Sequence, residues 1–276
     1  MRIAAALVLL GLLCGCSTMR LAYDNADIYL RWRAGTYLDV HGEAAEELDR
    51  RIASFVGWHR AQALPQYAAT AEEAAQRLSR GLSPEDLVWG YDSLLVQARE
   101  GLHAAAERVA PLLDRLDAGQ LAHLEQRIAE DNRRFARENL QGSEHERRRR
   151  RAQRIVERLE DWVGELSQAQ LERVRQYSDR APLTGEARDR DRRRLQAEVL
   201  ALVRARRARS GLAQRVAHWQ HGRDPAVAER FEASRSELFS MLLDLDRMLE
   251  PEQRARAVAS LRRYAADFRL LARRAP

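Results

Sequence analysis

The sequence has only two cysteines and no lysine among its 276 residues. Both cysteines, Cys14 and Cys16, lie near the N-terminus. The chain after residue 16 therefore excludes a disulfide, a thiolate metal site and a cysteine nucleophile. Because lysine is absent, all 47 basic side chains are arginines. Their planar guanidinium groups favour bidentate contacts with carboxylate and phosphate.

Proline and glycine are also scarce, with 7 and 14 residues. Stretches in which Val, Ile or aromatic residues alternate with polar ones, as in half-buried strands, are missing. Ala, Leu, Glu and Arg, which favour helices, are abundant instead. Apolar side chains recur at intervals of three and four residues along the chain. The sequence therefore predicts an all-α protein, an elongated multi-helix bundle.

The longest apolar run, Ile3 to Leu13, is too short to span a bilayer, which needs about 20 residues. It follows Arg2, as in a signal peptide. At its end, Leu13-Cys14-Gly15-Cys16 resembles the lipobox of bacterial lipoproteins. The resemblance implies that residues 1–15 are removed and that Cys16 carries acyl chains such as palmitate on its thiol and amine. Several acyl chains make a stable membrane anchor.

The alternative interpretation of this N-terminus is an ordinary secretory signal with two incidental cysteines. Ser17 follows the cysteine where retained lipoproteins of enteric-type bacteria have Asp. The resemblance thus implies a position on the periplasmic face of the outer membrane. Loss of Arg2 with residues 1–15 lowers the net charge from +6 to +5.

Residues 16–276 are long enough for one large helical domain or two modest ones. Pro182 and Gly185 favour a sub-boundary near residues 178–186. Pro65 falls inside a helical pattern and predicts a kink or break near Leu64. We also expect Leu159 and Trp162 to belong to the core.

A short pattern recurs at four predicted helix starts. Its copies are Leu82-Ser83-x-x-Asp86, Leu116-Asp117-x-x-Gln120, Leu166-Ser167-x-x-Gln170 and Leu249-Glu250-x-x-Gln253. The second residue caps the helix and the residue three positions later bonds back to it. The pattern also resembles the Leu-Thr-x-x-Gln motif of Spy-type periplasmic chaperones, but over a few residues each time. Capping explains each copy without that resemblance.

Several longer signatures are similar to a family of uncharacterised proteobacterial lipoproteins, known as a domain of unknown function. They are Tyr23-Asp24-Asn25-Ala26-Asp27, Trp58-His59-Arg60, Leu64-Pro65-Gln66-Tyr67, the run Arg147 to Arg151, Glu160-Asp161-Trp162-Val163-Gly164 and Pro251-x-Gln253-Arg254. This resemblance spans most of the chain after Cys16. It implies an envelope location and no known activity.

Two arginine-rich helices offer a candidate anion-binding face. Its residues are Arg147, Arg148, Arg149, Arg150, Arg151, Arg192, Arg193 and Arg194. The alternative is a solvated surface, because Glu and Asp are interleaved at spacings that form ion pairs along a helix. We expect the first run to be mostly exposed. For an exported protein, an anionic envelope component or an acidic protein is the expected partner, and not nucleic acid.

Catalytic motifs are missing: the chain has no Gly-x-Ser-x-Gly elbow, phosphate loop or zincin motif. His218 and His221 lack the further ligands that a metal site needs. Glu160 and Asp161 point about 100° apart on a helix, so they do not form a facing acid–base pair. We therefore expect no enzyme activity, no metal and no cofactor.

The sequence thus indicates a lipid-anchored envelope protein that acts by binding, as a scaffold, an adaptor or an envelope-maintenance factor. Its membrane contact is the lipid on Cys16. The alternative is a periplasmic chaperone that holds clients on a basic helical surface. An exposed apolar concavity would favour the chaperone, and a closed core with a basic stripe would favour the scaffold.

Overall fold

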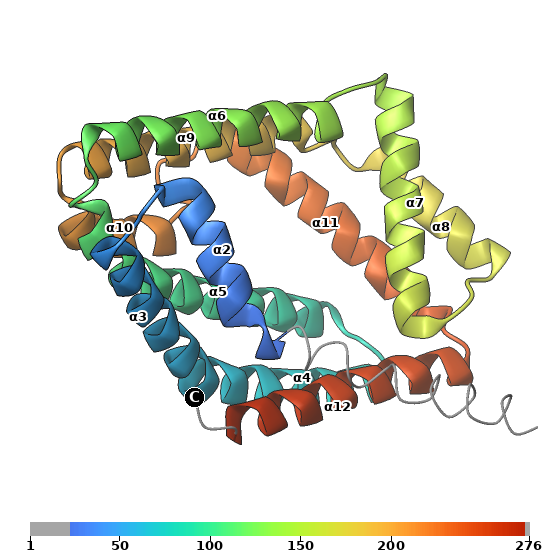
Figure 1. Cartoon of the computed structure of the whole chain (residues 1–276). Coiled ribbons are helices and arrows are strands. Elements are labelled where there is room, and N and C mark those ends of the chain that lie inside the picture. The colour runs from blue at the N-terminus through green and yellow to red at the C-terminus, as the bar shows by residue number, and fades with distance from the viewer. Residues whose placement is uncertain (1–22, 274–276) are drawn as a thin grey trace, which may run out of the picture.

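The computed structural model describes residues 23–273. Its elements are α2 (Ala26–Leu38), α3 (Glu43–Trp58), the π-helical turn η1 (His59–Ala63), α4 (Leu64–Ser79), α5 (Pro84–Leu113), α6 (Ala118–Asn139), α7 (Glu144–Val163), α8 (Gln168–Arg180), α9 (Gly185–Arg204), α10 (Ala208–Ala217), α11 (Pro225–Arg247) and α12 (Pro251–Arg273) (Figure 1). No strand occurs within residues 23–273, which confirms the predicted all-α, elongated helical bundle. The predicted lipobox and Cys16 lie outside the described residues.

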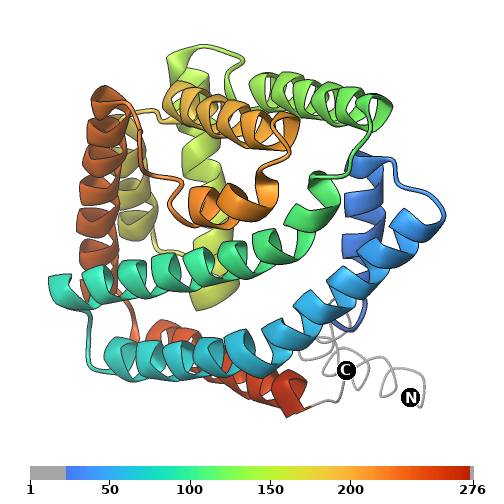
Figure 2. The same cartoon turned by 90° about the vertical axis from the view of Figure 1, so that its left-hand side faces the viewer.

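The helices form the sides of a closed frame (Figure 1). Along one side α6 lies beside α9, α7 and α8 form the next, and α4 lies beside α12 on the side opposite α6. On the remaining side, α2 contacts both α6 and α3, and α3 leads through η1 into α4. Helix α11 contacts both α9 and α8. Helix α5 crosses between the α6–α9 side and the α4–α12 side, and α10 packs against it (Figure 2). None of the helices within residues 23–273 is both long and apolar enough to cross a membrane.

Most of the buried apolar residues fall into three clusters. The largest joins α2, α3, α5, α6, α9 and α10 through residues such as Leu48, Leu112 and Leu212. A second joins α7, α8 and α11, and a third joins α7, the start of α8 and α12. Leu159 and Trp162 pack against these smaller clusters but are only half-buried, so the prediction that both belong to the core is only partly right.

The helix does not break at Pro65 but bends there, in line with the kink that was one of the two predicted outcomes (Figure 2). The π-helical turn η1 immediately precedes it, and the Leu64 N–H donates to the His59 carbonyl at the end of this turn. Pro65 has no N–H to donate, and a π-turn changes the register of the backbone hydrogen bonds at that point. Helices α3, η1 and α4 therefore form one continuous segment that bends here (Figure 2).

The recurring sequence pattern marks helix starts, as predicted. Complete capping boxes begin α5 at Ser83, α6 at Asp117 and α8 at Ser167, and a further one begins α7 at Ser143. At α12 the Gln253 side chain accepts a hydrogen bond from the Glu250 N–H at 3.2 Å. Local hydrogen bonding thus explains all four copies of the pattern.

Candidate functional site

The arginine run lies on the first three turns of α7, whose start is set by local chemistry. The Ser143 hydroxyl accepts from the Glu146 N–H, and the Glu146 carboxylate accepts from the Ser143 N–H at 2.7 Å. Gly142, at φ +90°, lets the chain turn into the helix after α6. Since successive helical residues point about 100° apart, this fixed start decides which arginines face the neighbouring helix.

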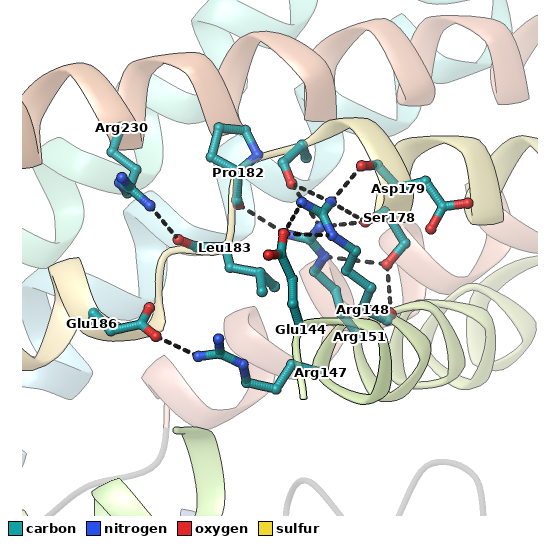
Figure 3. Close-up of polar contacts among 11 residues, drawn as sticks. Glu144, Arg147, Arg148, Arg151, Ser178, Asp179, Pro182, Leu183, Glu186 and Arg230 are labelled. Atoms are coloured by element: carbon teal, nitrogen blue, oxygen red, sulfur yellow. Dashed lines mark hydrogen bonds and ion pairs between the residues drawn. The ribbon is translucent and has the colours of Figure 1, made fainter. Parts of the chain in front are cut away.

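Arg148 and Arg151 face the C-terminal end of α8 (Figure 3). The Arg148 guanidinium donates to the carbonyls of Ser178 at 2.9 Å and Ala181 at 3.1 Å, and also to that of Asp179. Arg151 donates to the Ala181 carbonyl at 2.8 Å and to the Pro182 carbonyl at 2.9 Å. These carbonyls are left unpaired where a helix ends, and cations are favoured there.

The corner between α8 and α9 is therefore held by two arginines of α7. The buried Ser178 hydroxyl donates back to the Arg148 carbonyl at 2.6 Å. The Arg151 guanidinium lies 5.4 Å from the centre of the Tyr177 ring, and burial lowers the pKa of Arg151. The segment 178–186, which we predicted as a sub-boundary, is thus tied to α7 by side-chain hydrogen bonds.

The other members of the run have different surroundings. Arg147 forms an ion pair with Glu186 in the first turn of α9, and the hydrogen bond from Arg147 lowers the pKa of that carboxyl (Figure 3). Arg150 donates to the Gln141 carbonyl. Arg149 is the one exposed member of the run. The expectation that the run is mostly exposed is therefore wrong, because its other four members pack against neighbouring segments.

A small cavity of about 100 Å³ lies between α7, the end of α6 and the start of α9. Five arginines line it: Arg147, Arg150, Arg151, Arg154 and Arg188. Thr184 and Gly185, at the start of α9, line it too, and Glu138 is the one carboxylate in its lining. A Cβ atom on Gly185 would lie 3.0 Å from Leu140 Cδ2, so glycine permits the close approach of α9 to α6.

Of the five cavity arginines only Arg147 forms an ion pair within residues 23–273, and two of the other four are exposed. Among the described residues, Arg154 and Arg188 form no ion pair, and both are exposed at the rim. The Arg188 guanidinium lies 5.7 Å from the centre of the Phe135 ring. Both belong to the arginine-rich segments that the sequence marks out, but the sequence does not show that they meet, because they are separated by more than thirty positions and belong to different helices. We refer to this site as the arginine cavity.

The second arginine cluster, Arg192 to Arg194, is neutralised by its own helix. Arg192 and Arg193 bond to Asp189 at 2.8 and 2.7 Å. Although burial raises the pKa of Asp189, these bonds hold it below its ordinary value. Arg194 bonds to Asp191 at 2.8 Å and to the Trp219 carbonyl at 2.6 Å. These three arginines stabilise the structure and do not contribute to the arginine cavity.

Potential metal ligands and acids do not gather elsewhere in the described chain. The rings of His218 and His221 stack 4.9 Å apart, but no group of three or more His, Cys, Asp or Glu residues within residues 23–273 is placed to hold a metal ion. The buried carboxylates of Asp86 and Asp246 accept hydrogen bonds from Arg77 and Arg254. They are therefore partners in structural ion pairs.

Comparison with known proteins adds the family. No curated protein and no solved structure matches the chain. Residues 36–231 match the sequence model of a family of unknown function, DUF6279. The match contains all the residues of the arginine cavity, from Glu138 to Arg188. Since it covers more than half of the 276 residues, the chain belongs to the DUF6279 family of unknown function.

Proposed function

We propose that this protein is a lipid-anchored envelope protein that acts by binding an anionic envelope component through the arginine cavity. Cys16 carries the lipid and holds the protein on the periplasmic face of the outer membrane. The observation that carries the proposal is a cavity lined by five arginines and a single carboxylate, in which the exposed Arg154 and Arg188 form no ion pair within the described chain. No catalytic step, metal or cofactor is part of the proposal.

The chemistry of the cavity favours phosphate. Guanidinium groups bind phosphate oxygens through paired charge-assisted hydrogen bonds. The start of α9 adds the positive end of a twenty-residue helix, at Thr184 and Gly185. The rim residues Arg154 and Arg188 are open to solvent, so a phosphate on a lipid headgroup or on lipopolysaccharide can reach them. An acidic protein is the competing anionic partner.

A binding experiment tests the arginine cavity. The form that begins at residue 16 with Cys16→Ser keeps every described helix and removes the anchor. We expect it to bind vesicles of phosphatidylglycerol more tightly than vesicles of phosphatidylcholine, with binding that weakens as salt rises. Arg154→Gln with Arg188→Gln is expected to reduce binding about tenfold, which corresponds to about 1.4 kcal/mol.

The matched control is Arg149→Gln with Arg180→Gln, which removes the same charge from exposed arginines outside the cavity. Equal losses in both double variants would show that only overall charge matters and would contradict a specific site. Binding to neither vesicle, together with capture of an acidic protein that depends on Arg154 and Arg188, would favour the protein partner instead.

The anchor has its own test. Replacing Cys16 by Ala is expected to leave an uncleaved or soluble precursor without incorporated palmitate. Wild-type protein that stays in the membrane fraction without labelled palmitate would contradict the lipid anchor. The outer-membrane location is tested by separating the two membranes of the cells on a density gradient.

A second candidate function is a chaperone that holds clients in the periplasm. The observation that favours it is an apolar groove between α4, α5 and α12, with Leu94 64 % exposed at its mouth. A chaperone of this kind would suppress aggregation of an unfolded protein in solution, and Leu94→Glu would abolish that effect.

A further inference from the structure

The apolar groove is lined by side chains from four helices. It lies between α4, α5, α12 and the end of α7, with a volume of about 630 Å³, within the range of small-molecule sites. Its large apolar lining residues are Trp89, Leu94, Trp162, Leu261, Tyr264 and Phe268. Alanines and a glycine of α4 and α5 leave the space between these larger side chains.

The lining selects an apolar occupant. None of the residues that line the groove is charged. Gln97 and Thr70 supply polar groups, but the Gln97 amide donates to the Thr70 hydroxyl at 2.6 Å, so they already pair with each other. A phosphate inside the groove would lose its hydration and meet no cationic side chain in the lining. A hydrocarbon chain has no hydrogen bonds to lose and gains about 0.8 kcal/mol per buried methylene.

A continuous row of aromatic side chains leads from the start of the described chain to this groove. It runs through Tyr23, His59, Tyr67, Phe268, Tyr264 and Trp162, and its successive ring centres are 5.6, 5.4, 5.8, 6.4 and 5.5 Å apart. The Tyr23 hydroxyl is also 2.8 Å from His59 Nδ1, which fixes the start of the row. The last four rings of the row line the groove.

The predicted lipid attachment point is close to this row. Cys16 precedes Tyr23 by seven residues. An extended chain covers at most about 3.3–3.6 Å per residue, so seven residues reach about 25 Å. Tyr23 lies only three ring-to-ring steps, each below 6 Å, from Phe268 in the groove. The linker is therefore long enough to bring an acyl chain on Cys16 to the groove.

We infer that one of the acyl chains carried by Cys16 folds back and occupies the apolar groove. The inference rests on the proposed lipid anchor and assigns a place within the protein to one of its chains. The chain covers Leu94 and Tyr264, which are otherwise 64 % and 39 % exposed. Methylenes gain similar free energy in a groove and in a bilayer, and the other chains of a multiply acylated cysteine keep the protein on the membrane.

Photo-cross-linking tests this assignment in the full-length protein. Cells are grown with a palmitate analogue that has a diazirine near its methyl end, membranes are irradiated, and cross-linked peptides are identified by mass spectrometry. We expect the peptide that contains Cys16 to be joined to peptides of α5 and α12 that line the groove. Leu94→Glu places a charge at the mouth of the groove and is expected to lower this yield at least fivefold.

Val88→Glu is the matched control, because Val88 is 49 % exposed on the same helix but does not line the groove. It is expected to keep the wild-type yield. Label on Cys16 that cross-links only to phospholipid, or to residues outside the groove, overturns the inference and leaves the anchor intact. Absence of label from the Cys16 peptide overturns the anchor and the inference together.

A second arm identifies the source of any acyl chain in the groove. With Cys16→Ser, we expect cross-linking of the groove peptides to disappear. Groove labelling that persists in this variant would assign the occupant to a free membrane lipid and would overturn the assignment to Cys16. Cross-links that join α5 to peptides of another protein would identify an apolar client and would support the chaperone.

Discussion

The side-chain amides of Gln170 and Gln253 form a reciprocal pair of hydrogen bonds between the starts of α8 and α12. Gln170 Nε2 donates to Gln253 Oε1 at 2.8 Å, and Gln253 Nε2 donates to Gln170 Oε1 at 3.2 Å. Each amide oxygen also accepts the N–H of its own helix start, at Ser167 and Glu250. Two copies of the recurring sequence pattern thus cap their helices and join them to each other.

This pair predicts a large effect of Gln170→Leu on stability. Gln170 is 1 % exposed, and its replacement removes the hydrogen bonds that its side chain forms with the Ser167 N–H, the Met248 carbonyl and the Gln253 amide. We expect the free energy of unfolding in urea to fall by about 2–3 kcal/mol. Gln120→Leu at the equivalent, more exposed position of α6 is the control, with an expected loss of about 1 kcal/mol or less. Equal losses would mean that capping alone is responsible.

Neighbouring arginines of α7 are expected to differ in their contributions to stability. Arg151→Gln removes the guanidinium that binds the carbonyls of Ala181 and Pro182. Hydrogen bonds from a charged donor contribute about 1.5–3 kcal/mol, so the loss in unfolding free energy is expected to be of that size. Arg149→Gln, two positions earlier and exposed, is expected to change it by less than about 0.5 kcal/mol. Thermal and urea unfolding of both variants measure this contrast.

Stability is expected to fall as the pH is lowered below about 6.5, through His59. Burial lowers the pKa of its imidazole from the ordinary value of 6.5. The unfolded chain then binds a proton more readily than the folded protein, so the free energy of unfolding decreases between pH 6.5 and the lower folded-state pKa. His59→Gln is expected to flatten urea midpoints measured from pH 7.5 to 5.

Trp162 is expected to tolerate truncation better than a buried tryptophan. It is half-buried and forms part of the groove, 5.5 Å from the Tyr264 ring. Trp162→Ala is therefore expected to lower the unfolding free energy by less than the about 3–5 kcal/mol typical of a core tryptophan. Leu64→Ala, at a residue 1 % exposed, serves as the reference and is expected to lose about 2–5 kcal/mol. A loss of about 3–5 kcal/mol at Trp162 would place it in the core.

The helices and most of their starts were predictable because their causes are local. Apolar residues at helical spacing, and capping pairs such as Ser83 with Asp86, act within one or two turns. The bend near Leu64 was also predictable from Pro65. Its form was not, since the choice between a break and a π-turn depends on what each side of the bend packs against.

The arginine cavity was only partly predictable. The run on α7 stands out in the sequence, but which members face α8, which face α9 and which face solvent depends on neighbours far along the chain. Arg148 and Arg151 contact carbonyls about thirty residues away, and Arg188 reaches the cavity from α9. The run Arg192 to Arg194 is equally rich in arginine, but ion pairs with Asp189 and Asp191 neutralise its charge.

By itself the sequence determined that the described chain is helical and where most helices begin, because these properties follow from hydrogen bonds and side-chain spacing within a few residues. It also determined the candidate anchor at Cys16, which is a short linear motif. The tertiary structure alone decided the groove. Trp162 is expected in the core from the pattern of its own helix, and only the way the helices meet places it with Trp89 and Phe268 around an open apolar space.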